Sequence, residues 1–183
     1  TLADVGQYKE ALPLADKAVE LDPVSISSLH NLGWTNFCAG NYQKSIDGFS
    51  KAVELHPTFS WGYIKRAYGY IKLGEYDKAI ADAQKAESLF KDGWGSELLQ
   101  STLAFIYKNS KDKPKADSVI NRFMKYAAAN KVEDPFTLSA IYYVMGDYKN
   151  ANLWEQKTVN ERSASAYLLN VSELYDPKYF NSP

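Results

Sequence analysis

A short phrase, glycine followed two residues later by tyrosine, recurs along the chain at a fixed interval. The glycines are Gly6, Gly40 and Gly74, so both intervals are 34 residues. A fixed period of this length indicates a solenoid in which each repeat is one pair of helices. Glycine can adopt the left-handed conformation that ends a helix, and the tyrosine is expected to begin the next one. The interval therefore predicts helix–turn–helix units stacked along the chain.

Two weaker copies of the phrase continue the series. One places Lys111 at the glycine position, 37 residues after Gly74, and the other begins at Gly146, after another 35 residues. Small residues recur five positions after each anchor, where we expect two helices to approach closely. They are Ala11, Ser45, Ala79, Ala116 and Ala151. The residue before a proline avoids the helical region, so Asp22-Pro23 and His56-Pro57 are expected to end helices.

The pattern Trp or Leu, Gly, Tyr, Gly-x-Tyr, Ala, Phe, Ala, Pro is best kept between Leu29 and Pro57. Because the pattern recurs with the period, the chain resembles tetratricopeptide repeat (TPR) proteins over nearly its whole length. The resemblance implies an all-α fold. We expect a right-handed α-α superhelix, the TPR solenoid, of about four and a half helix–turn–helix repeats with a C-terminal capping helix.

The resemblance also implies a division of the sequence into repeats. We expect a single TPR domain over residues 1–183. Its parts are a half repeat at 1–25, repeats at about 26–59, 60–94, 95–131 and 132–163, and a capping tail at 164–183. The glycine-rich stretch Lys91–Ser96 is expected to take up the longer spacing before the fourth repeat. A half repeat cannot bury its apolar face alone, so we expect a fragment of a longer chain, with a native short N-terminus as the alternative.

The end of the chain carries a second resemblance. Met145–Pro183 is similar to the last repeat of TPR regions in bacterial multidomain regulators. The matching residues are Gly146-Asp147, Ala151, Trp154, Glu161-Arg162 and Asp176–Phe180. This resemblance implies a neighbouring domain upstream, such as a winged-helix, kinase or nucleotide-cyclase domain. The apolar run Ala166–Tyr175 is expected to cover the outer face of the last repeat.

The bulk composition excludes several classes of protein. Twenty-one basic and 22 acidic residues give a net charge of −1, which argues against direct nucleic-acid contact. The one cysteine, Cys38, cannot form an internal disulfide. No apolar run approaches the length of a membrane span. We expect a cytoplasmic protein without membrane contact, with the periplasm left open because the N-terminus looks truncated.

The residues that usually carry catalysis are not grouped. His30 and His56 are the only two histidines and fall on different predicted helices, which disfavours a metal site. No histidine is in phase with Cys38 to activate it. The stretch Asp92–Ser96 lacks the lysine of a phosphate loop. We therefore expect no enzyme, no metal and no cofactor.

The first helix of each unit is the predicted place for binding, because in TPR proteins these helices line a concave face. Register on this face gives the candidate partner-binding residues. They are His30, Trp34, Phe37, Trp61, Ile64, Tyr68, Lys72, Phe105, Lys108, Phe136 and Tyr143. An aromatic groove of this kind suits an extended or helical hydrophobic segment. The Lys/Asn clamp of TPR domains that hold chaperone tails is missing, since the matching pairs are His30/Trp34, Ile64/Tyr68 and Ser101/Phe105.

Two functions follow from this pattern. The first is a protein–protein interaction scaffold or sensor module whose partner is a protein, a peptide or another domain of its own chain. The alternative is a regulatory or homodimerisation segment of a bacterial signalling protein, such as a transcription regulator or a nucleotide cyclase. The same rings could instead fill the core between neighbouring repeats or form a self-association surface, and these interpretations are left open.

Overall fold

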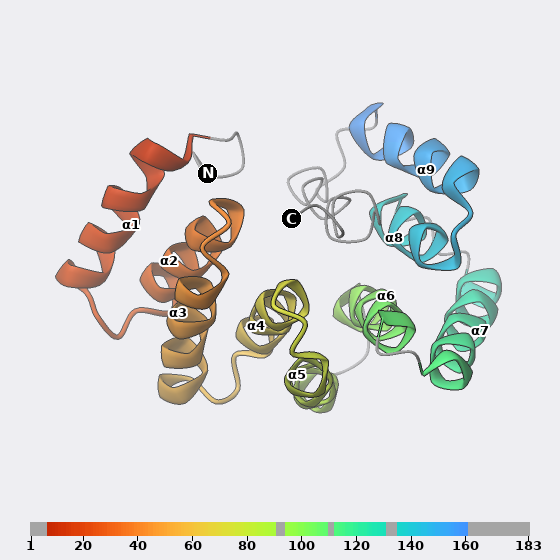
Figure 1. Cartoon of the computed structure of the whole chain (residues 1–183), viewed down its shortest axis with the longest axis horizontal. Helices are drawn as coiled ribbons and strands as arrows, with labels where there is room; N and C mark the ends of the chain where they lie inside the picture. The colour runs from red at the N-terminus through yellow and green to blue at the C-terminus, as the bar shows by residue number, and fades with distance from the viewer. Residues whose placement is uncertain (1–6, 91–93, 110–111, 131–134, 161–183) are drawn as a thin grey trace. The chain divides into compact units, whose positions relative to one another are not determined.

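The computed structural model describes residues 7–90, 94–109, 112–130 and 135–160, and within these ranges all regular structure is α-helical (Figure 1). The helices are α1 (Tyr8–Leu21), α2 (Ile26–Cys38), α3 (Tyr42–Leu55), α4 (Ser60–Lys72), α5 (Tyr76–Leu89), α6 (Trp94–Asn109), α7 (Lys113–Asn130), α8 (Pro135–Met145) and α9 (Tyr148–Asn160). The all-α solenoid of paired helices predicted from the sequence is confirmed. No helix in the described ranges is long and apolar enough to cross a membrane.

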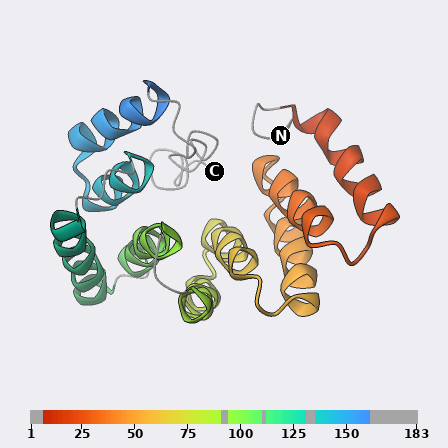
Figure 2. The same cartoon turned by 180° about the vertical axis from the view of Figure 1, so that it is seen from behind.

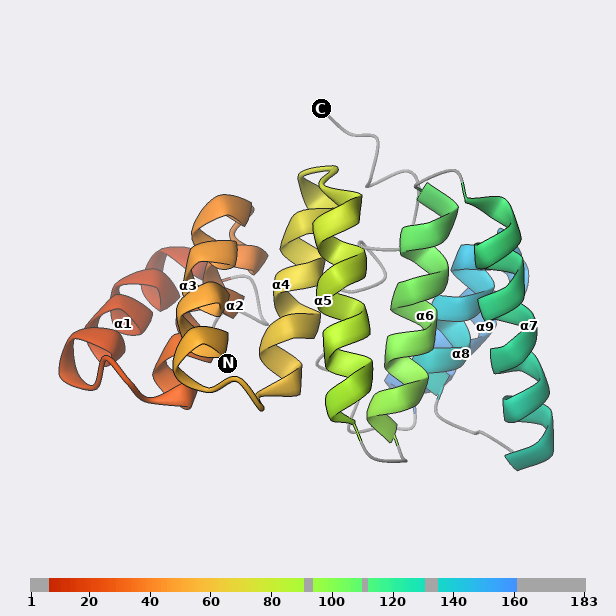
Figure 3. The same cartoon turned by 90° about the horizontal axis from the view of Figure 1, so that it is seen from below.

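The chain divides into two compact units. The N-terminal unit is Thr1–Lys91 and the C-terminal unit is Asp92–Pro183. In the N-terminal unit, α2 pairs with α3 and α4 with α5, while α1 packs on α2 and α3 packs on α4 (Figure 2). In the C-terminal unit, α6 pairs with α7 and α8 with α9, and α6 also contacts α8 (Figure 3). The expected division of residues 1–183 into one domain of numbered repeats stays a prediction.

The glycine turns have the conformation that the sequence predicted. Gly40, Gly74 and Gly146 have φ angles of 79°, 73° and 82°, which lie in the left-handed region. The residue after each glycine donates its backbone N–H across the turn to the preceding helix, as Asn41 does to the carbonyl of Asn36 at 2.8 Å. This bond satisfies a carbonyl that the helix leaves unpaired. The next helix then begins at the tyrosine of the phrase in all three cases.

The close approach of helices rests on small residues. Ser45, Ala79 and Ala151 are fully buried in their helix pairs. In the α2–α3 pair the backbones come close at Gly33 and Gly48, where a Cβ on Gly48 would lie 3.2 Å from the Cα of Gly33. The phenyl ring of Phe49 covers Gly33 and is itself fully buried. The glycines therefore let a large ring fill the centre of this pair.

Carboxylates begin two helices of the C-terminal unit. Asp112 accepts a hydrogen bond from the backbone N–H of Lys115 at 3.2 Å, and Asp147 accepts one from that of Asn150 at 3.1 Å. Hydrogen bonds from the side chains of Lys115 and Asn150 lower the pKa of Asp112 and Asp147 below the ordinary value. Both carboxylates satisfy helix N–H groups and favour the helix dipole. Gly6, Lys111 and the expected capping tail at 164–183 lie outside the described residues.

Candidate functional site

The predicted partner-binding residues fall on the first helices of the pairs. In the N-terminal unit, α2 and α4 contact each other and carry His30, Trp34, Phe37, Trp61, Ile64, Tyr68 and Lys72. In the C-terminal unit, α6 and α8 contact each other and carry Phe105, Lys108, Phe136 and Tyr143. The structure thus groups seven candidates in one unit and four in the other. We call the first group, together with Lys65, the α2–α4 face.

A cluster of aromatic rings forms the centre of the α2–α4 face. The rings of Trp34 and Phe37 stack with centroids 5.3 Å apart, and Phe37 also contacts Tyr68 at 6.4 Å and Tyr42 at 5.6 Å. Trp34, Phe37 and Tyr68 are all buried. Aromatic pairs at these distances add stabilisation beyond their buried area. The cluster therefore ties α2 to α4 and gives the face a rigid base.

Lys65 lies on this base, and sequence reasoning missed it. Its ammonium nitrogen is 3.7 Å from the centroid of the Trp34 ring and 5.5 Å from that of Tyr68. The residue is only 5% exposed, which is unusual for lysine. Both rings hold the cation through the negative potential of their faces. The sequence contains one indication of this contact: Lys65 is three residues before Tyr68 on the same helix, a spacing that brings two side chains together.

Three other candidates of the α2–α4 face are half-buried. His30 contacts the edges of Phe49 and Phe59 at 5.9 and 6.1 Å, and Trp61 contacts Phe90 at 5.8 Å. Lys72 is half-buried at the end of α4. Ile64, by contrast, is fully buried and belongs to the core. The parts of the α2–α4 face nearest to solvent are thus His30, Trp61 and Lys72.

The charges of α2 and α4 are all positive. Neither helix contains an acidic residue, and α4 contains Lys65, Arg66 and Lys72. Arg66 points toward the second helices of the pairs, where its Nε and Nη2 each lie 2.7 Å from the carboxylate of Asp82. The hydrogen bond to Asp82 is the main reason why the pKa of Arg66 is raised. The other two cations of α4 are Lys65 and Lys72, which belong to the α2–α4 face.

The four candidates of the C-terminal unit are buried or make contacts between the helices of that unit. Phe105 and Phe136 are buried. The Tyr143 hydroxyl lies 2.7 Å from Glu155 Oε2 and 3.0 Å from Asn152 Oδ1, so it joins α8 to α9. Lys108 donates a hydrogen bond to the carbonyl of Val144, and burial lowers its pKa. These contacts hold α8 against α6 and α9.

The described residues contain no group of three His, Cys, Asp or Glu side chains that could hold a metal ion. Cys38 is half-buried at the end of α2.

Comparison with known proteins agrees with this architecture. The family model described as "Tetratricopeptide repeat" matches residues 62–92, which cover most of α4 and all of α5. The TPR repeat-containing protein YpiA of Bacillus subtilis is 26% identical over 151 residues, 81% of this chain and 34% of the relative. The STIP1 homolog of Dictyostelium discoideum is 24% identical over 161 residues, 85% of this chain and 28% of the relative. The chain thus spans about a third or less of the length of these relatives.

Solved structures give the same result. A crystal structure of MamA protein superposes with a TM-score of 0.57 at 26% identity and covers 71% of this chain and 68% of that one. The thermophilic TPR protein TTC0263 of Thermus thermophilus superposes with a TM-score of 0.65 at 18% identity over 93% and 91% of the two chains. These similarities establish the repeat fold.

Proposed function

We propose that this chain, which is a tetratricopeptide repeat protein, binds a segment of a partner protein at the α2–α4 face of its N-terminal unit. Proteins with these repeats generally mediate protein–protein interactions, and the fold is typically a non-enzymatic scaffold. The observation that carries the proposal is the ammonium of Lys65, 3.7 Å from the Trp34 ring centroid, on a pair of helices without acidic residues.

The chemistry of the face favours an acidic partner segment that also carries apolar or aromatic side chains. A carboxylate of the partner would approach Lys65 and Lys72, where burial reduces the screening by water that weakens exposed ion pairs. Apolar side chains next to that carboxylate would contact Trp61 and His30, which are half-buried. The buried rings of Trp34, Phe37 and Tyr68 would support the site from below.

The regulatory or homodimerisation function of a bacterial signalling protein stays a prediction. It depends in part on the resemblance of Met145–Pro183, most of which lies outside the described residues.

Replacing Lys65 with methionine tests the proposal, because methionine keeps an unbranched apolar chain but removes the charge. Lys65→Met is expected to reduce the capture of partner proteins from a lysate of the source organism about fivefold, which corresponds to about 1 kcal/mol of lost cation–π and ionic interaction. The captured proteins would be quantified by mass spectrometry. Lys85→Met, on the exposed side of α5, is the matched control. Equal capture by wild type and Lys65→Met would rule out the α2–α4 face.

A further inference from the structure

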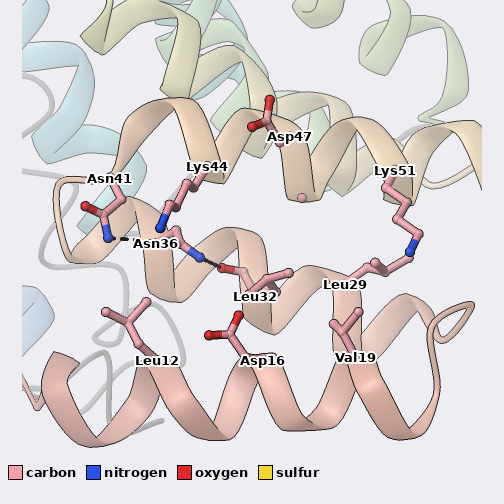
Figure 4. A pocket seen from close by; sticks show the side chains of 11 residues that line it. Leu12, Asp16, Val19, Leu29, Leu32, Asn36, Asn41, Lys44, Asp47 and Lys51 are labelled. Carbon is pink, nitrogen blue, oxygen red and sulfur yellow. Dashed lines mark hydrogen bonds between the residues drawn. The ribbon is translucent and has the colours of Figure 1, made fainter.

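A cavity of about 460 Å³ lies between α1, α2 and α3 (Figure 4), and its lining does not include Trp34, Lys65 or Tyr68. One wall is α1, where Asp16 stands between Leu12 and Val19. The opposite wall is α3, which contributes Lys44, Asp47 and Lys51; the Asp47 carboxylate points away from α1 and accepts a hydrogen bond from Gln43 at 2.9 Å. The cavity therefore has Asp16 on one side, two lysines and an aspartate that points away on the other, and apolar surface between them.

The next groove along the N-terminal unit, between α3, α4 and α5, is filled by the protein itself. Arg66 of α4 lies across it, with bidentate hydrogen bonds to Asp82 of α5 at 2.7 Å and a third hydrogen bond to Ser50 of α3 at 3.1 Å. The rings of Tyr63 and Tyr70 flank the guanidinium, with centroids 5.6 and 5.9 Å from its central carbon. An arginine between aromatic rings and next to a carboxylate is the natural occupant of this groove.

Comparison of positions 34 residues apart shows why the cavity between α1, α2 and α3 is not filled in the same way. Leu32 stands one period before Arg66, so the cation is missing, and Gly48 stands one period before Asp82, so that carboxylate is missing too. The tyrosines are replaced by the smaller Leu29 and Asn36. Gly48 cannot gain a side chain easily, because its Cβ would meet the backbone of Gly33 at 3.2 Å.

The α1 wall of the cavity carries a carboxylate that has no counterpart in the next repeat. Asp16 stands one period before Ser50, so α1 carries an acid where α3 carries a hydroxyl. Among the described residues Asp16 has no ion pair or hydrogen bond, and its side chain points into the cavity (Figure 4). The cavity between α1, α2 and α3 thus contains a carboxylate that can accept hydrogen bonds from a guanidinium, but no arginine lines it.

We propose that this cavity binds a segment of a partner protein in which an arginine lies next to an acidic residue. The guanidinium pairs with Asp16 and takes the place that Arg66 fills one repeat later. The acidic residue pairs with Lys44 or Lys51 on the α3 wall. This matches the charges of Asp16 and of the two lysines, and the segment's apolar side chains cover Leu29 and Leu32. The site is separate from the α2–α4 face and uses none of its residues.

A pair of peptides that differ only in the guanidinium provides the test. The probes are acetyl-Tyr-Arg-Glu-Tyr-amide and the same peptide with neutral citrulline in place of arginine. Titration into the isotope-labelled chain is followed by NMR shifts of the Leu32 and Gly48 amides. We expect the arginine peptide to bind about fivefold more tightly, the upper range for an ion pair that remains open to solvent. Asp16→Asn is expected to remove this difference, while Asp77→Asn, on exposed α5 surface, keeps it.

A second variant fills the cavity from within. Leu32→Arg places a guanidinium at the position equivalent to Arg66, beside Asp16, and is expected to abolish binding of the arginine peptide without lowering the unfolding midpoint. Equal binding of the two peptides, or an unchanged preference in Asp16→Asn, would overturn the inference. Lys65→Met should leave the peptide preference intact, so failure of this site and failure of the α2–α4 face are distinguishable.

Discussion

Replacing Asp82 with alanine is expected to lower the free energy of unfolding of the N-terminal unit by about 3–5 kcal/mol. The side chains of Arg66 and Asp82 are only 18% and 8% exposed, and their bidentate contact spans α4 and α5. Alanine at position 82 would leave the guanidinium largely buried without its counter-ion. This loss of stability is larger than the net free energy that the ion pair contributes, because the desolvation of the remaining charge is then uncompensated.

Urea unfolding followed by circular dichroism would measure this effect. Asp77→Ala on the same helix is the control, since Asp77 is exposed and its replacement should change stability by about 0.5 kcal/mol or less. A double variant, Arg66→Leu with Asp82→Ala, should recover part of the loss, because neither charge is then stranded. The ion pair would not be important to the fold if Asp82→Ala and Asp77→Ala unfolded at the same urea concentration.

Replacing Phe49 with alanine is expected to cost about 3–5 kcal/mol, the range for removal of a fully buried phenyl ring. The ring is completely buried and lies against Gly33, where an added Cβ would be 2.9 Å from three of its carbons. Gly33→Ala alone should cost about 1–3 kcal/mol through overpacking. One period later the same two positions hold Ala67 and Ala83, so the chain itself contains the alternative packing.

The double variant Gly33→Ala with Phe49→Ala copies that alternative. It is expected to be more stable than the sum of the single effects predicts, since the methyl group introduced at position 33 occupies part of the space that the ring leaves. A double-mutant cycle by urea unfolding measures the coupling. Strict additivity of the two changes would contradict the interpretation that glycine and ring are matched to each other.

The period in the sequence predicted the local structure well because its signals are local. Gly40, Gly74 and Gly146 end their helices through backbone conformation alone, so the helices after them begin at the predicted tyrosines. Depth of burial could not be predicted in this way. Register assigned Trp34 and Tyr68 to a face, but their burial depends on the distance between α2 and α4, which periodicity does not set.

Lys65 and the cavity escaped prediction for related reasons. Lys65 lies outside the register positions that define the concave face, and only the folded chain shows its contact with Trp34. The cavity results from a difference in volume between two repeats, Leu29, Leu32 and Asn36 against Tyr63, Arg66 and Tyr70. The smaller side chains leave a cavity because α1 and α3 lie on either side of α2. In the next repeat, α3 and α5 lie on either side of α4, and Arg66 fills the space between them. The sequence alone does not show these neighbours.

Site-specific cross-linking tests the central claim, that the α2–α4 face holds the partner protein, most directly. A photo-reactive phenylalanine derivative would replace Trp61, which is half-buried on α4, and in a control chain Gln84, which is exposed on α5. We expect cross-links to an acidic, apolar segment of a partner at position 61 but not at position 84, and their loss when Lys65→Met is added. Cross-links at position 84 alone, or cross-links at position 61 that persist in Lys65→Met, would contradict the claim.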